Sequence, residues 1–144
     1  MDFRHTSIVV AFDGSEPSQR ALRRGVKLAI DLELGLKIVH VFPREADASA
    51  GFGSALENAE DSPAAQLAGQ AASLAEDMAG AQALDIEPVV LDGDPAHALL
   101  DYLDECDRPI MVMGRRGHGA LSALLLGSVS DKVVRHAHCP VMIV

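Results

Sequence analysis

Five short runs along the chain consist almost entirely of apolar residues, many of them valine and isoleucine. Nearly continuous apolar character over so short a length is typical of strands that are buried on both faces of a sheet. The pattern therefore predicts five strands, at residues 7–12, 36–41, 86–91, 109–114 and 140–144.

The segments between these runs place apolar residues three or four positions apart, which is the spacing of one face of an amphipathic helix. Leu67, Ala71 and Leu74 are one example. Four helices are predicted, over residues 16–33, 63–82, 95–106 and 128–137. Because strands and helices alternate, we expect a single α/β domain over residues 1–144, an open parallel sheet with helices on both faces. In residues 43–63, small and acidic side chains predict a disordered or variable surface segment.

Composition and charge limit the classes of protein to which the chain can belong. Apolar residues make up 49% of the chain and charged residues 23%, which is typical of a globular domain. The net charge of −9 disfavours nucleic-acid binding, which needs a basic face for phosphates. No apolar run approaches the roughly 20 residues of a membrane helix, and no signal peptide is evident. We therefore expect a cytoplasmic protein without membrane insertion, in which Cys106 and Cys139 are buried and have no redox role.

The residues after each predicted strand are candidates for a binding site, because ligands of open parallel sheets bind beyond the carboxyl ends of the strands. Asp13 follows the first strand, and the stretch GRRGHGALSALLLGSVS, residues 114–130, follows the fourth and carries no carboxylate. Its glycines let a phosphate approach the backbone, and the helix predicted at its end offers free N–H groups and a positive dipole end. We expect a phosphate site here, with Ser128 as the helix cap.

Two familiar phosphate motifs do not match the sequence. The pattern GxxxxGK[ST] is absent, and the first strand–helix turn reads FDGSEPS rather than GxGxxG, which disfavours P-loop and dinucleotide-binding Rossmann sites. The spacing that does occur is Gly114-x2-Gly117-x9-Gly127-Ser128. With Asp13-Gly14-Ser15 near the start and Gly93-Asp94-Pro95 after the third strand, the chain resembles the universal stress protein family, specifically its ATP-binding branch, over nearly its whole length.

The resemblance implies a Rossmann-like sheet of order 3-2-1-4-5, in which the ends of the first and fourth strands flank the binding crevice. It implies that Asp13 and the Val41 backbone hold the adenine and ribose, and that the glycine-rich stretch holds the phosphates through N–H and hydroxyl groups. The implied nucleotide-binding residues are Ala11, Phe12, Asp13, Val41, Met113, Gly114, Arg116, Gly117, His118, Gly127, Ser128, Val129 and Ser130. Arg115 is left out, because many relatives have a small residue there. The implied ligand is ATP, or ADP or AMP, with Mg²⁺ carried on the phosphates rather than in a protein cage.

The leading interpretation is a nucleotide-dependent regulator of the stress response. It would act on an unidentified protein partner such as a transporter and hydrolyse ATP slowly or not at all. No catalytic residue is predicted, because no general base or carboxylate-rich metal site is evident. The alternative is a weak ATPase or phosphotransferase at the same site, with His118 transferring a proton or a phosphoryl group. A phospho-accepting receiver domain is disfavoured, because Phe12 stands where a second acid is needed.

The fifth predicted strand, residues 140–144, is apolar and lies at the edge of the implied sheet. An apolar edge invites pairing, and members of the family commonly dimerise this way, so we expect a homodimer or a higher oligomer through this strand. His136 and His138 precede Cys139 with a spacing that resembles a metal site. Because no second ligand cluster exists, we interpret them as helix-end histidines that interact with the dipole.

Overall fold

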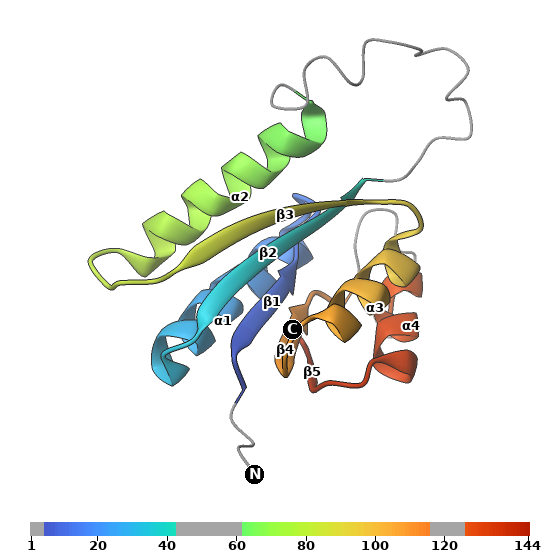
Figure 1. The fold of residues 1–144 in the computed structure, drawn as a ribbon. Helices are drawn as coiled ribbons and strands as arrows, with labels where there is room; N and C mark the ends of the chain where they lie inside the picture. The colour runs from blue at the N-terminus through green and yellow to red at the C-terminus, as the bar shows by residue number, and fades with distance from the viewer. Residues whose placement is uncertain (1–4, 43–61, 116–125) are drawn as a thin grey trace.

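The computed structural model describes residues 5–42, 62–115 and 126–144. These residues form five strands and four α-helices that alternate along the chain (Figure 1). The strands are β1 (Ser7–Ala11), β2 (Gly35–Phe42), β3 (Ile86–Asp92), β4 (Pro109–Met113) and β5 (Val141–Ile143). The helices are α1 (Glu16–Leu32), α2 (Pro63–Ala79), α3 (Pro95–Glu105) and α4 (Ser128–His136). Every predicted strand and helix is therefore confirmed.

Three of the described helices begin with a side chain that accepts a hydrogen bond from a free N–H group of the first turn. These caps are Ser15 for α1, Ser62 for α2 and Asp94 for α3, and each is followed by a proline in the first turn. Helix α2 ends at Ala79, earlier than predicted, because Gly80 takes a positive φ of 62°. No helix among the described residues combines the length and the apolar character of a membrane span. Of the predicted irregular segment, residues 43–61 lie outside the described ranges.

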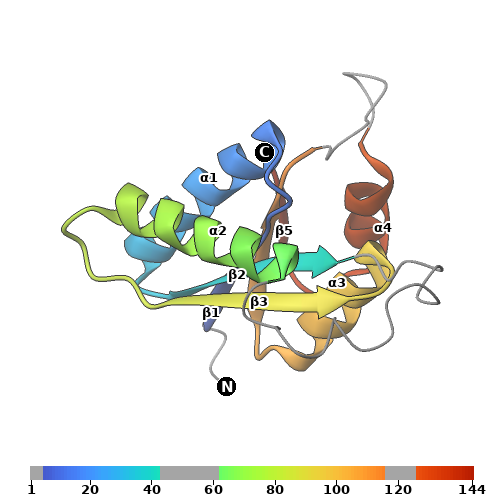
Figure 2. The same cartoon turned by 90° about the horizontal axis from the view of Figure 1, so that it is seen from above.

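The sheet has the order β3-β2-β1-β4-β5, and all its strands are parallel. Helices α1 and α2 cover one face, and α3 and α4 cover the other (Figure 2). Residues of β1 alternate between the two faces: Ile8 and Val10 pack towards α1 and α2, and Val9 packs towards α3 and α4. The doubly covered sheet explains why the strands read as continuous apolar runs. The predicted fold class and strand order are confirmed.

Helix α1 approaches the central strand so closely that only glycine fits at one contact. A Cβ atom at Gly25 would lie 2.3 Å from Cγ2 of Val10, well inside van der Waals contact. Val10 is fully buried in the middle of the sheet and has little room to move. Gly25 therefore sets the distance between α1 and β1, and with it the position of the turn that joins them.

Gly25→Ala should lower the free energy of unfolding by roughly 1–3 kcal/mol, because the added methyl group overpacks the contact with Val10. Urea denaturation measures the change. Gly69→Ala is the matched control, because nothing lies within 4 Å of a Cβ at that position of α2. The control should be stabilising by about 0.5–1 kcal/mol, the usual gain for alanine in a helix. Equal effects of the two substitutions would contradict the close-contact explanation.

Candidate functional site

The ends of β1 and β4 lie side by side at the centre of the sheet. Strand β1 pairs with β2 on one side and with β4 on the other, with Val10 opposite both Ile38 and Val112. The chain connects β1 to β2 through α1 on one face, whereas β4 leads to α4 on the other face (Figure 1). This is the point where the strand order reverses, and it is where ligands bind in sheets of this kind.

Asp13 lies in the turn between β1 and α1 and is half-buried. Its Oδ1 accepts a hydrogen bond of 2.9 Å from the Ser15 N–H group, and its own N–H group donates to Ser18 Oγ at 3.3 Å. Gly14 between them takes a φ of 84°, a conformation that favours glycine. The Asp13 carboxylate thus helps to build the turn that starts α1, and the turn fixes the position of the carboxylate at the end of the sheet.

His40 on β2 is a site residue that the sequence analysis missed. Its Nδ1 lies 3.0 Å from the carbonyl oxygen of Phe12, and a carbonyl can only accept, so Nδ1 carries the proton. The N–H group of Phe12 donates to the Val39 carbonyl at 2.8 Å. Both polar backbone groups of Phe12 are therefore held by β2, immediately before Asp13. The signal for this role was a histidine in a strand whose other residues, apart from Lys37, are apolar or glycine.

Gly114 follows β4 and lies against the first turn of α1. A Cβ atom at this position would lie 2.8 Å from both the carbonyl carbon and the Cβ of Pro17, and 2.9 Å from the Pro17 carbonyl oxygen. Backbone atoms cannot give way as a flexible side chain can. The glycine was predicted to be needed for close approach of a phosphate, but the structure also gives a packing reason for it. Gly114 thus holds the end of β4 against the start of α1.

Helix α4 begins without the side-chain cap that the other described helices have. Its N-cap is Gly127, which has extended backbone angles, and Ser128 is the first helical residue. The prediction that Ser128 is the cap is therefore wrong by one position, a shift that local sequence cannot resolve. The first bond within the helix runs from the Asp131 N–H group to the Gly127 carbonyl at 2.9 Å. The N–H groups of residues 128–130 face the helix end, and no side chain among the described residues caps them.

Ser130 is buried, and its hydroxyl group bonds within the chain. Ser130 Oγ lies 2.7 Å from the carbonyl oxygen of Arg115 and 3.1 Å from that of Gly127. The Gly127 N–H group donates to the same Arg115 carbonyl at 2.8 Å. The resemblance implied a phosphate contact for residues 127–130 through N–H and hydroxyl groups. In this structure the Ser130 hydroxyl group bonds to carbonyl oxygens, so the donor that Ser130 offers at the helix end is its backbone N–H group.

Four of the other predicted site residues lie on the same face of the sheet. Ala11, Val41, Met113 and Val129 all pack in the core cluster beneath α3 and α4. Phe12 belongs to the cluster on the opposite face and is buried there. The side chains of Met113 and Phe12 are buried and therefore offer no surface to a ligand. The remaining predicted residues, Arg116, Gly117 and His118, lie outside the described residues.

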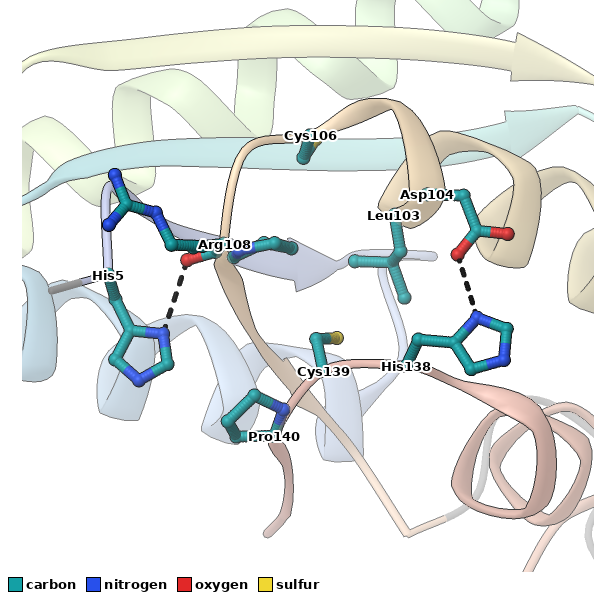
Figure 3. A pocket seen from close by; sticks show the side chains of 9 residues that line it. His5, Leu103, Asp104, Cys106, Arg108, His138, Cys139 and Pro140 are labelled. Carbon is teal, nitrogen blue, oxygen red and sulfur yellow. Dashed lines mark hydrogen bonds and ion pairs between the residues drawn. The ribbon is translucent and has the colours of Figure 1, made fainter. Parts of the chain in front are cut away.

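A hollow of about 270 Å³ lies at the amino end of the strands, opposite to the end that carries Asp13 and Gly114 (Figure 3). Its lining includes both cysteines, which are free and half-buried rather than buried as predicted. Burial raises the pKa of the Cys139 thiol, and the charges of Asp104 and Cys106 add to the effect, whereas a backbone hydrogen bond from Met111 opposes it. His138 Nδ1 lies 3.2 Å from Asp104 Oδ1. Among the described residues, no three metal-ligating side chains converge.

Comparison with known proteins identifies the family. The family model described as the universal stress protein family matches residues 5–144. The chain belongs to the universal stress protein family. Universal stress protein YxiE of Bacillus subtilis is 33% identical over 144 residues, which cover 95% of this chain and 97% of that protein.

Two solved structures of universal stress proteins have the same fold. Universal stress protein UspA from Lactobacillus plantarum has a TM-score of 0.78 and 25% identity, with 98% of both chains covered. A universal stress protein in complex with cAMP has a TM-score of 0.70 and 27% identity, with 97% of this chain and 96% of that chain covered. The protein is thus similar over nearly its whole length to a universal stress protein that holds a nucleotide.

Gly114→Ala should destabilise the ligand-free protein by roughly 1–3 kcal/mol, because its methyl group would collide with the Pro17 backbone. Gly35→Ala is the control, because a Cβ there would meet Asp85 atoms only at the ordinary distances of 3.8 and 4.0 Å. Both variants are compared with the wild type by urea denaturation. An unchanged stability of Gly114→Ala would mean that the glycine serves a ligand alone.

Proposed function

We propose that this universal stress protein binds an adenine nucleotide in the crevice between the ends of β1 and β4, with the phosphates at the start of α4. The observation that carries the proposal is the start of α4, where no side chain among the described residues caps the N–H groups of residues 128–130. Such groups, together with the positive end of the helix dipole, favour a phosphate. The similar universal stress protein in complex with cAMP supports an adenine nucleotide as the ligand.

The start of α1 is a poorer phosphate site than the start of α4, although both helices begin at the crevice. Ser15 Oγ already accepts from the Ser18 N–H group, and Asp13 Oδ1 accepts from the Ser15 N–H group. The carboxylate of Asp13 also lies at this turn, whereas the carboxylate in the first turn of α4, that of Asp131, pairs with Arg135 at 3.0 Å. This asymmetry favours the adenine and ribose near Asp13 and the phosphates near Ser128, the orientation that the family resemblance implies.

The nucleotide that we propose is ATP, with Mg²⁺ held by its phosphates and by water. Support for ATP comes from the spacing Gly114-x2-Gly117-x9-Gly127-Ser128 in the sequence. We further propose that bound nucleotide regulates a protein partner and is hydrolysed slowly at most. Asp13 Oδ1 already accepts from the Ser15 N–H group, and Asp131 in the first turn of α4 pairs with Arg135 at 3.0 Å. Both carboxylates are thus engaged in ways that suit recognition and structure better than activation of water.

Ser128→Asp should separate stability from binding. A carboxylate in the first turn of α4 interacts favourably with the helix dipole, so the variant should be as stable as the wild type or more stable by about 0.3–1 kcal/mol. The same charge repels phosphate, so affinity for AMP, ADP and ATP should fall by roughly tenfold or more. Calorimetric titration of nucleotide-free protein, with and without Mg²⁺, measures binding.

Ser128→Asn is the control, because it has nearly the same shape without the charge and should retain most of the affinity. Equal affinity of Ser128→Asp and the wild type would place the phosphates elsewhere. Phosphate release from ATP, followed in the same samples, measures any hydrolysis.

We also propose that two copies of the chain pair through β5, which is an edge strand of the sheet. Met142 at its centre is 37% exposed, and the strand is apolar throughout. An unpaired apolar edge favours antiparallel pairing across a two-fold axis, which would bring the two Met142 residues close together.

Met142→Lys should therefore shift the protein towards the monomer, because two like charges would meet at the proposed axis. Light scattering after size-exclusion chromatography gives the mass in solution. Leu74→Lys is the matched control, since Leu74 on α2 is equally exposed at 37% but lies far from β5. A monomeric wild type, or a dimer that persists in Met142→Lys, would contradict pairing through this strand.

A further inference from the structure

Residues 115 and 127 flank the central part of the glycine-rich stretch and are joined directly by hydrogen bonds. The Arg115 carbonyl oxygen accepts from the Gly127 N–H group at 2.8 Å and from Ser130 Oγ at 2.7 Å. Ser130 is only 2% exposed, so this hydroxyl is shielded from competing water. The two bonds fix the first turn of α4 against the peptide that follows β4.

The Arg115 peptide is also held from its other side, by the edge of the sheet. Its N–H group donates to the Val144 carbonyl oxygen at 3.2 Å, and the Val144 N–H group donates to the Met113 carbonyl oxygen at 3.0 Å. Both the N–H group and the carbonyl group of Arg115 are therefore hydrogen-bonded. Arg115 thus connects the start of α4 to the ends of β4 and β5 through backbone hydrogen bonds, rather than through flexible side chains.

A hydroxyl group has one proton to donate. Ser130 Oγ has carbonyl oxygens at 2.7 and 3.1 Å, and both can only accept, so its proton is shared between them. An ionised phosphate oxygen can only accept hydrogen bonds, and it is repelled by the lone pairs of the hydroxyl oxygen. While the bond to Arg115 exists, the hydroxyl group cannot also donate to a phosphate.

We propose that Ser130 is a positioning residue of the nucleotide site: its hydroxyl group holds the Arg115 carbonyl and thereby aims the N–H groups of residues 128–130 at the phosphates. This role of Ser130 rests on the proposed nucleotide binding, and it differs from direct contact between the Ser130 hydroxyl group and a phosphate. Ser128, which is exposed at the same helix end, is the serine whose hydroxyl is free to face a ligand.

The test compares Ser130→Ala, Ser130→Thr and Ser128→Ala with the wild type in two measurements. The first is calorimetric affinity for AMP, ADP and ATP. The second is hydrogen exchange of the Gly127 amide in nucleotide-free protein, followed by NMR, with the amides of Val9 and Val10 in the buried β1 as a reference for global opening. The second measurement needs no ligand and therefore reports on the hydrogen bonds alone.

Ser130→Ala should speed exchange of the Gly127 amide by roughly tenfold, leave the β1 amides at wild-type rates, and weaken all three nucleotides by a similar factor of roughly ten. Ser130→Thr keeps the hydroxyl group and should restore both properties. Ser128→Ala should leave Gly127 exchange unchanged, because its side chain does not cap the helix among the described residues.

Weaker nucleotide binding by Ser130→Ala with unchanged Gly127 exchange would overturn the proposal, because the hydroxyl would then act on the ligand directly. Unchanged affinity with faster exchange would also overturn it, because the bond would then be structural only. A wild type that binds none of the three nucleotides would instead refute the proposed function and the inference with it.

Discussion

The pairing of β1 with β4 at the centre of the sheet brings the starts of two helices to the same end of the sheet. Helix α1 follows β1 and covers one face, and α4 follows β4 and covers the other. The first turn of α1 is closed by its own Ser15 cap and packs on Gly114. The first turn of α4 has no side-chain cap among the described residues. The two helix ends are thus unequal, because among the described residues only the first has a side-chain cap.

Close contacts hold the first turns of α1 and α4 against the ends of the strands. Gly25 allows α1 to rest on Val10, and Gly114 allows its first turn to rest on the end of β4. On the other side, the Arg115 peptide ties the start of α4 to the end of the sheet. Such a preformed arrangement reduces the ordering cost of binding. The Arg115 N–H group donates to Val144 at the end of β5, so the proposed nucleotide site and the proposed dimer edge are both bonded to this one residue.

Most of the fold could be predicted from the sequence, because it depends on local patterns. Apolar runs and helical spacing are properties of neighbouring residues, and they located all strands and helices. The strand order came from the family resemblance, and with it the position of Asp13 and Gly114 at one crevice. Caps could be predicted less well, since Ser128 and Gly127 are adjacent and both suit a helix start.

The features that sequence analysis missed all depend on residues distant in sequence. The need for glycine at position 114 arises from Pro17, and the role of His40 arises from the Phe12 carbonyl. The hydroxyl of Ser130 was expected at the phosphates, and only the position of the Arg115 carbonyl shows where its proton goes. Local spacing carries no information on such contacts, because they form when separate strands and helices pack.

An NMR titration of isotope-labelled, nucleotide-free protein with AMP, in which every backbone amide is followed, tests whether nucleotide phosphates bind at the start of α4. We expect the largest shifts for the amides of Ser128, Val129 and Ser130, with further shifts at Asp13, because phosphate would accept hydrogen bonds from the N–H groups of the first turn. Shifts confined to the hollow around His5 and Cys139, or no shifts at saturating AMP, would contradict this expectation.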